Sequence, residues 1–236
     1  MTISLSQPTP LIEYPEEDNQ PMPEGDRQRR NLSYATEALR LWFEHRHDVY
    51  VSGNLFIYYE KGQKEKVVAP DTFVVFGVNQ ADRGSYKVWE EDGKTPDFIL
   101  EITSKGTVSK DRNDNPKIYR QLGVKEYFQY DPTGEYLKPR SIQGVKLEGE
   151  KYVNIPIKIL DNDVLSLTST VLGLDLRLYP DRGFRFYDPR SDEILRSLQE
   201  SEQDREIEKQ ARFIAEQKSQ RLAARLKALG INPDEI

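Results

Sequence analysis

The sequence predicts an α/β protein in which a mixed sheet is flanked by helices and followed by a long C-terminal helix. Three observations support this fold class. An amphipathic helical pattern comes first, a series of apolar strand patterns follows it, and a short helical pattern interrupts that series. Helices that alternate with strands in this way favour a sheet with helices on its faces. A charged helical pattern closes the chain.

The composition bounds the class of protein. The 236 residues suffice for one domain with a sizeable core and an extension. A net charge of −6 argues against a broad basic surface for nucleic acid but allows a local basic patch. The absence of cysteine excludes disulfides, cysteine-ligated zinc and cysteine nucleophiles. No apolar run approaches the ~18–20 residues of a membrane span, and residues 1–30 show no signal pattern. We therefore expect a soluble, cytoplasmic protein without a membrane partner.

Three regions are expected along the chain. Residues 1–30 contain five prolines and no periodicity, which predicts an extended or disordered arm. Residues 31–190 carry the alternating patterns and form the predicted domain. Residues 191–236 form a long helix, with a coiled coil as one possibility.

Apolar spacing places the individual elements. Helical patterns cover residues 31–46, 116–122 and 191–229. Strand patterns cover residues 48–59, 67–78, 86–89, 97–103, 124–130 and, as short strands and hairpins, 136–187. Turns are expected at Gly53-Asn54 and near Gly144 and Gly149, and Gly123 is expected to end the short helix.

Two of these strands carry acidic residues within apolar sequence. In residues 97–103, alternation places Phe98, Leu100 and Ile102 on one face and Asp97, Ile99, Glu101 and Thr103 on the other. Asp71 interrupts the apolar run of residues 67–78. A carboxylate in such a position is costly unless a cation or a basic side chain pairs with it. Two neighbouring strands of this kind predict a cation site, and hard oxygen ligands favour Mg²⁺ or Mn²⁺ over zinc.

An alternative interpretation applies to two of these residues. Asp71 and Asp97 each follow a proline, and Pro-Asp pairs are common in turns. Either can therefore be a strand-entry residue instead of a ligand. Glu101 lies in mid-strand, which favours a functional role.

The same residues resemble a known nuclease motif. Pro70-Asp71, a gap and Glu101-Ile102-Thr103 look like the PD-(D/E)xK motif. Longer stretches are similar to the Uma-two-type putative restriction endonucleases, and they lie at residues 48–56, 69–71, 96–104, 122–128 and 221–233. The resemblance implies a restriction-endonuclease-like core that hydrolyses DNA, with Asp71 and Glu101 as ligands of Mg²⁺ or Mn²⁺. In this superfamily a helical glutamate sometimes completes the metal site, which makes Glu37 a weaker candidate.

The sequence departs from the motif at its lysine. Thr103 stands where the motif places lysine, and Asn115 stands where the resemblance implies a lysine on the following helix. Lys117 is the nearest lysine, but two residues along a helix correspond to a rotation of ~200°. Lys105 and Lys110 are the other catalytic candidates. A catalytically inactive nuclease-fold module, used for binding or assembly, is therefore the rival hypothesis.

A local excess of basic residues adjoins the proposed site. Six basic residues and two acidic ones lie between Thr103 and Lys125, and the basic set is Lys105, Lys110, Arg112, Lys117, Arg120 and Lys125. Such residues can contact the phosphates of DNA. A solvated loop and helix face is the alternative interpretation.

The C-terminal helix is expected to need a partner. Residues 199–206 contain no apolar residue, and apolar stripes follow at Ile207, Ala211, Ile214 and at Leu222, Leu226, Leu229. Helices draw most of their stability from packing. We expect the outer half to pair between two subunits of a homodimer. A helix folded back on its own sheet is the alternative.

Overall fold

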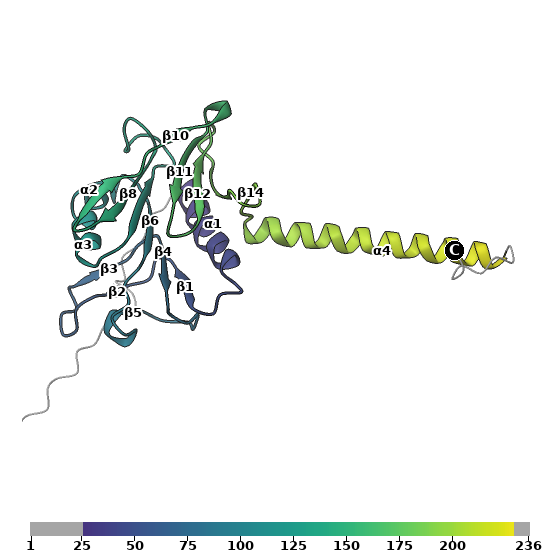
Figure 1. The fold of residues 1–236 in the computed structure, drawn as a ribbon, viewed down its shortest axis with the longest axis horizontal. Helices are drawn as coiled ribbons and strands as arrows, with labels where there is room; N and C mark the ends of the chain where they lie inside the picture. The colour runs from purple at the N-terminus through teal and green to yellow at the C-terminus, as the bar shows by residue number, and fades with distance from the viewer. Residues whose placement is uncertain (1–25, 229–236) are drawn as a thin grey trace, which may run out of the picture. The chain divides into compact units, whose positions relative to one another are not determined.

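The structure is a computed structural model that describes residues 26–228 (Figure 1). It divides into two compact units, one ending at Leu195 and the other beginning at Arg196. The first unit is a mixed α/β domain, which confirms the predicted fold class. Residues 1–25, most of the expected N-terminal arm, lie outside the described part of the chain.

A six-stranded mixed sheet forms the centre of the first unit. Its spatial order is β1 (Val49–Ser52), β4 (Thr72–Phe76), β6 (Phe98–Ile102), β7 (Glu126–Tyr130), β8 (Ile142–Glu148) and β9 (Lys151–Asn154). β6 and β7 pair in parallel, and all other neighbours pair antiparallel. Parallel neighbours need a crossover connection. Two short helices, α2 (Val108–Asn113) and α3 (Asn115–Gln121), supply it.

Two smaller sheets complete the domain. An antiparallel sheet has the order β10 (Lys158–Ile159), β11 (Leu165–Ser169), β12 (Leu174–Leu178), β13 (Phe184–Asp188) and β14 (Glu193–Ile194). A three-stranded sheet has the order β3 (Val67–Val68), β2 (Ile57–Tyr58) and β5 (Tyr86–Lys87). Short 3₁₀ turns lie at Val88–Glu90 and Asp161–Asp163.

The two faces of the central sheet bury different apolar cores. Helix α1 (Asp26–Trp42) and the inner faces of β11–β13 cover the first face, where Phe98, Leu100 and Ile102 are buried. The second face buries Ile99 together with Tyr119 of α3. The period-two assignment of β6 is therefore correct, and Glu101 belongs to the face that α3 covers.

Several predicted features differ from the structure. Helix α1 begins at Asp26 and ends at Trp42, a turn earlier at each end than predicted. Helix α2 lies in residues expected to be irregular, because its only buried side chain is that of Asp111 and no apolar stripe marks it. Gly144 lies inside β8, not in a turn. A Cβ atom there would meet the Phe128 ring at 2.6 Å, so close strand packing explains this glycine.

The second unit contains the long helix α4 (Leu198–Ala228), which begins later than Ser191. Ser197 caps it: the Glu200 amide donates to Ser197 Oγ at 3.1 Å, and the Ser197 amide donates to Glu200 Oε2 at 2.8 Å. This reciprocal pair is a capping box. Ile194 instead lies in β14, and Leu195 is buried in the first unit. Among the described helices, none is long and apolar enough to cross a membrane.

Candidate active site

The pairing of β4 with β6 brings Asp71 and Glu101 together. Thr72 lies opposite Leu100 in this antiparallel pair, so the preceding Asp71 faces Glu101. The Asp71 amide donates to Glu101 Oε2 at 3.1 Å, and the Ile102 amide donates to Asp71 Oδ2 at 2.6 Å. Each carboxylate thus accepts a backbone N–H from the other's strand segment. These bonds fix both side chains where the start of β4 meets the end of β6.

A close backbone approach holds Asp71 in place. The Asn54 amide donates to the Pro70 carbonyl at 2.9 Å. A Cβ atom on the neighbouring Gly53 would lie 2.1 Å from the Asp71 carbonyl oxygen. Only glycine allows the turn after β1 to pack this closely against the start of β4. The predicted Gly53-Asn54 bend therefore has a direct role in building the site.

Glu101 is a buried carboxylate with uncharged hydrogen-bond donors. Its side chain is 5% exposed, and its Oε1 accepts bonds from Tyr119 Oη at 2.6 Å and Asn115 Nδ2 at 3.2 Å. Burial raises the pKa of Glu101 well above its ordinary value, and the negative charges of Asp71 and Asp111 raise it further. The hydrogen bond from Tyr119 acts in the opposite direction. The burial of Glu101 beside two other carboxylates therefore disfavours its charged form.

Asp111, on α2, is a site residue that the sequence analysis missed. It is 3% exposed, and Asn115 Nδ2 donates to its Oδ1 at 3.2 Å. Burial raises its pKa from 3.8 to about 6. Its backbone carbonyl accepts bonds from Tyr127 Oη at 2.9 Å and Gln129 Nε2 at 2.8 Å. These bonds tie α2 to β7 and hold Asp111 beside Glu101.

Three oxygen atoms near Glu101 are buried without a hydrogen-bond partner among the described residues. They are Thr103 Oγ1, Asp111 Oδ2 and Asn115 Oδ1. A buried polar atom without a partner is costly. Residues 26–228 contain no group of three or more His, Cys, Asp or Glu arranged to hold a metal. Mg²⁺, however, commonly binds through one or two carboxylates and keeps several waters. Asp71, Glu101 and these neighbouring oxygens therefore fit an ion of that kind.

The predicted lysines have exposed side chains, and the positive charge of Lys110 partly offsets the effect of burial on the pKa of Asp111. Lys117 is 70% exposed in its side chain and lies 3.9 Å from Asp114, in agreement with the rotation expected between it and Asn115. Lys105 and Lys110 are also exposed. Asn115 is 4% exposed and bonds directly to Glu101. An uncharged amide thus occupies the position where the sequence resemblance implies an ammonium group.

Asp97 and Glu37 do not join the pair. Asp97 lies at the opposite end of β6, where its Oδ2 accepts the Phe76 amide at 2.8 Å and its Oδ1 lies 2.7 Å from Lys125 Nζ. It lies at the entry to β6 and pairs with Lys125, and this position separates it from Glu101. Glu37 lies on α1, whose buried residues pack on the other face of the sheet from Glu101.

Part of the predicted basic patch is bound to the protein itself. Arg112 donates to the Tyr136 carbonyl, Arg120 donates to the Glu150 carbonyl at 3.4 Å, and Lys125 pairs with Asp97. Lys105, which precedes α2, and Lys110, which lies on α2, both have exposed side chains.

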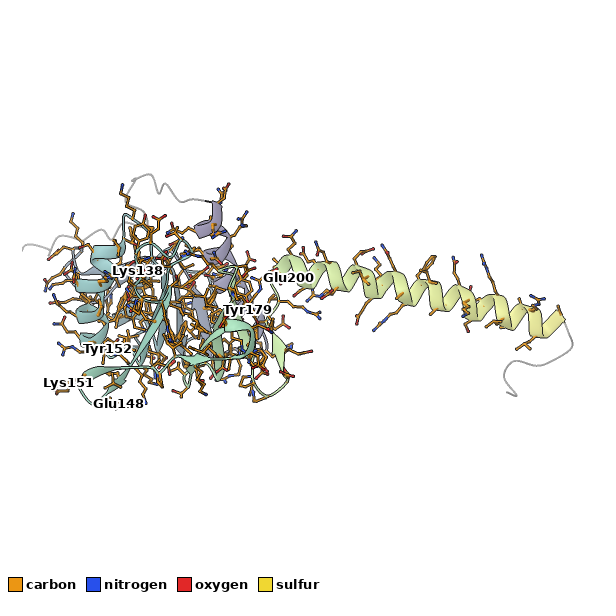
Figure 2. The ribbon with its side chains drawn as sticks, turned by 90° about the horizontal axis from the view of Figure 1, so that it is seen from above. Lys138, Glu148, Lys151, Tyr152, Tyr179 and Glu200 are labelled. Carbon is orange, nitrogen blue, oxygen red and sulfur yellow. The ribbon has the colours of Figure 1, made fainter. Side chains whose placement is uncertain are left out.

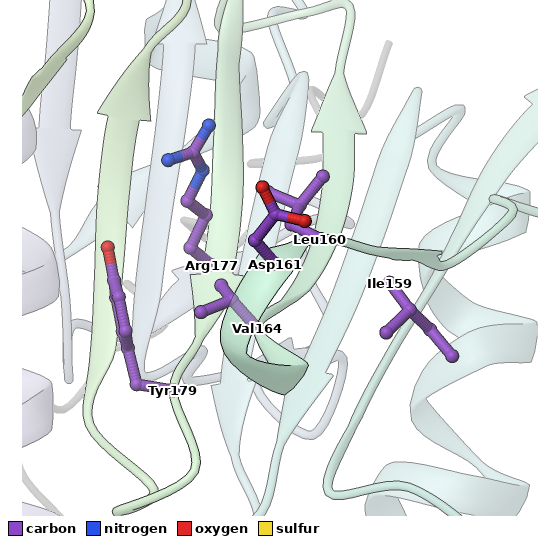
Figure 3. Close-up of a pocket in the computed structure, with 6 residues that line it drawn as sticks. All are labelled: Ile159, Leu160, Asp161, Val164, Arg177 and Tyr179. Carbon is purple, nitrogen blue, oxygen red and sulfur yellow. The ribbon is translucent and has the colours of Figure 1, made fainter.

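A cavity of about 520 Å³ lies elsewhere, against β10–β12 (Figure 3). Its lining residues are Ile159, Leu160, Asp161, Val164, Arg177 and Tyr179. Arg177 Nε is buried without a hydrogen bond among the described residues, but the guanidinium lies 3.2 Å from the centre of the Tyr187 ring. Stacking on the Tyr187 ring therefore stabilises the Arg177 guanidinium without a hydrogen bond to Nε. None of the lining residues belongs to the Asp71–Glu101 site.

Comparisons with known proteins identify the family of the chain. A putative nuclease belonging to DUF820 from Anabaena variabilis ATCC 29413 is similar in structure, with a TM-score of 0.36 and 16% sequence identity over 58% of this chain and 75% of that one. No curated protein matches the chain. The model of the family described as Uma2, putative restriction endonuclease, matches residues 3–179. The chain therefore belongs to the Uma2 family of putative restriction endonucleases.

Proposed function

We propose that the chain is an endonuclease that hydrolyses DNA phosphodiester bonds with Mg²⁺ or Mn²⁺ bound at Asp71 and Glu101. One observation supports this most strongly. Glu101 is buried beside two further carboxylates, and within the described residues its hydrogen-bond donors are all uncharged. A cation would offset this negative charge, and the oxygen ligands suit Mg²⁺ or Mn²⁺.

The proposed roles follow from the contacts. When bound, the ion would polarise a phosphoryl oxygen and activate a water for in-line attack. Tyr119 and Asn115 orient Glu101 Oε1, because both donate hydrogen bonds to it. Lys105, just before α2, and Lys110, on α2, are exposed and can contact the phosphates of DNA. Each can also stabilise the negative charge that develops in the transition state. Lys117 is less suited to this role because it points toward Asp114.

Asn115 favours a second candidate function. An amide can hold Glu101 in place, but it supplies no positive charge to the reaction. In this hypothesis the chain keeps the nuclease fold, binds DNA or a protein without cleaving it, and assembles as a homodimer through α4. The two functions differ in catalysis and agree in the metal site.

Metal binding and cleavage are measured separately to distinguish these functions. Isothermal titration with Mg²⁺ or Mn²⁺ should show binding by the wild type and none by the double variant Asp71→Ala, Glu101→Ala. Equal binding by the two proteins would remove the metal site from both functions. Asp114→Ala is the matched control, since this acidic side chain is 66% exposed and pairs with Lys117.

Cleavage is then tested on linear, supercoiled and single-stranded DNA with each metal. The endonuclease predicts metal-dependent cleavage by the wild type and by Asp114→Ala, and none by Glu101→Gln. Metal binding without cleavage by the wild type, together with cleavage by Asn115→Lys, would establish the inactive module instead. The new ammonium group would then occupy the position next to Glu101 that the amide holds now.

A further inference from the structure

Helix α4 exposes large apolar side chains in its outer part. The exposed fractions are 64% for Ile207, 60% for Phe213, 64% for Ile214 and 54% for Leu222. Figure 2 shows side chains that extend from α4 both above and below the helix in that view. A helix of 31 residues with such side chains in water gains little from its own packing. The exposed apolar residues therefore favour a partner for this helix.

Charge on α4 is divided between its two halves. Residues 198–208 contain five acidic residues and one basic residue, a net charge of −4. Residues 209–228 contain six basic residues and one acidic residue, a net charge of +5. The helix dipole favours acidic residues only within about the first turn and basic ones within the last. Here the acidic run extends to Glu208, in the third turn, so the dipole does not account for it.

We infer that α4 pairs with α4 of a second copy of this chain in an antiparallel orientation centred near Ile214. In this orientation the acidic half of each helix lies along the basic half of the other. A parallel pair would instead place −4 beside −4 and +5 beside +5, and like charges across a helix interface are unfavourable. Charge complementarity thus favours a second copy of α4 as the partner of the exposed face. It also favours the antiparallel orientation of the two helices.

The apolar residues fit the same arrangement. Around a two-fold axis between Ile214 and Ala215, Ile207 of one copy lies beside Leu222 of the other, and the two Ile214 side chains flank the axis. The small side chain of Ala211 comes opposite Lys218, whose aliphatic stem can cover it. Asp204 comes opposite Arg225. One register therefore pairs apolar residues with apolar residues and acidic residues with basic ones.

Distance measurements on the full chain test the orientation. The protein contains no cysteine, so single cysteines can be spin-labelled at the exposed glutamines Gln203 and Gln217. At ~1.5 Å per residue, the antiparallel pair separates the two labels at Gln203→Cys by ~35 Å along the axis and those at Gln217→Cys by only ~8 Å. A parallel pair gives similar short separations at both positions. Pulsed dipolar spectroscopy that finds two short distances, or no dipolar coupling at either site, would overturn the inference.

Charge reversal tests the source of the pairing. We expect Arg221→Glu, Arg225→Glu to dissociate the dimer at least about tenfold more readily in light scattering, because the acidic half would then face acidic residues. Mixing that variant with Asp204→Lys, Glu208→Lys should restore a dimer of the two different chains. An unchanged dimer in every variant would show that charge does not direct the pairing. A monomeric wild type whose DNA binding is lost on reversal would make α4 a nucleic-acid contact and refute the dimer.

Discussion

Replacing Asp111 with asparagine should stabilise the metal-free protein above neutral pH. Burial raises the pKa of Asp111 from 3.8 to about 6, a difference of about two units. Each unit corresponds to about 1.4 kcal/mol, so ionising Asp111 costs the folded state roughly 3 kcal/mol. Asparagine keeps an oxygen that can accept the bond from Asn115 Nδ2 and carries no charge. We therefore expect a gain in the free energy of unfolding of up to roughly 3 kcal/mol at about pH 8.

The sign of the pH dependence follows from the direction of the shift. Because the pKa is higher in the folded state than in the unfolded state, the folded protein binds the proton more tightly between about pH 6 and pH 4. Wild-type stability should thus rise as the pH falls through this window, and the advantage of Asp111→Asn should shrink over the same window. The raised pKa of Glu101 acts in the same direction in both proteins.

Urea unfolding in the presence of a chelator, repeated across this pH range, measures the effect. Asp114→Asn is the matched control: it is the same substitution at a side chain that is 66% exposed, and a change within about 0.5 kcal/mol is expected. Saturating Mg²⁺ should stabilise the wild type more than Asp111→Asn, because the cation offsets the same repulsion. A loss of stability in Asp111→Asn that is independent of pH would refute the reasoning. The hydrogen bonds of Asp111 would then outweigh the cost of its charge.

Two further predictions concern the supports of the carboxylate pair. Tyr119→Phe removes the 2.6 Å donor to Glu101 and should cost roughly 1–3 kcal/mol of unfolding free energy near pH 8, with a smaller cost in acid where Glu101 is protonated. An equal cost at every pH would mean that only packing is lost. Gly53→Ala places a Cβ atom 2.1 Å from the Asp71 carbonyl oxygen and should cost roughly 1–3 kcal/mol while weakening Mg²⁺ binding in titration calorimetry. Gly106→Ala, whose nearest neighbouring atom would lie 3.9 Å away, is the control and should leave both quantities unchanged.

The carboxylate pair was predictable because the alternation of side chains along a strand can be read from the local sequence. Alternation in β6 assigns Glu101 to one face, and the apolar run around Asp71 indicates a second buried strand. The sequence could not distinguish Asp97 from Asp71, since both follow proline. The difference lies in tertiary pairing: Asp97 meets Lys125, whereas Asp71 meets Glu101.

The predicted helix boundaries were wrong where polar contacts, and not apolar ones, hold the helix in place. Helix α2 has no apolar stripe, and its position depends on bonds from Tyr127 and Gln129 to one backbone carbonyl. At the C-terminal helix, Ile194 and Leu195 fit helical spacing, and this obscured the true start. The Ser197-x-x-Glu200 signature of a capping box was present in the sequence and marks the boundary correctly.

The spacing of three polar residues explains how the crossover builds the site. Asn115 and Tyr119 are four residues apart and share one face of α3, and Asp111 of α2 lies four residues before Asn115. In the connection between the parallel strands β6 and β7, that face turns toward Glu101, with Asn115 donating to both carboxylates and Tyr119 to Glu101. Asn115 is therefore the position at which one side chain contacts both acidic groups. A positive charge there would neutralise them directly, whereas the amide leaves their charge to an external cation. Under the proposed function, we therefore expect the occupant of position 115 to set how strongly the folded protein depends on metal.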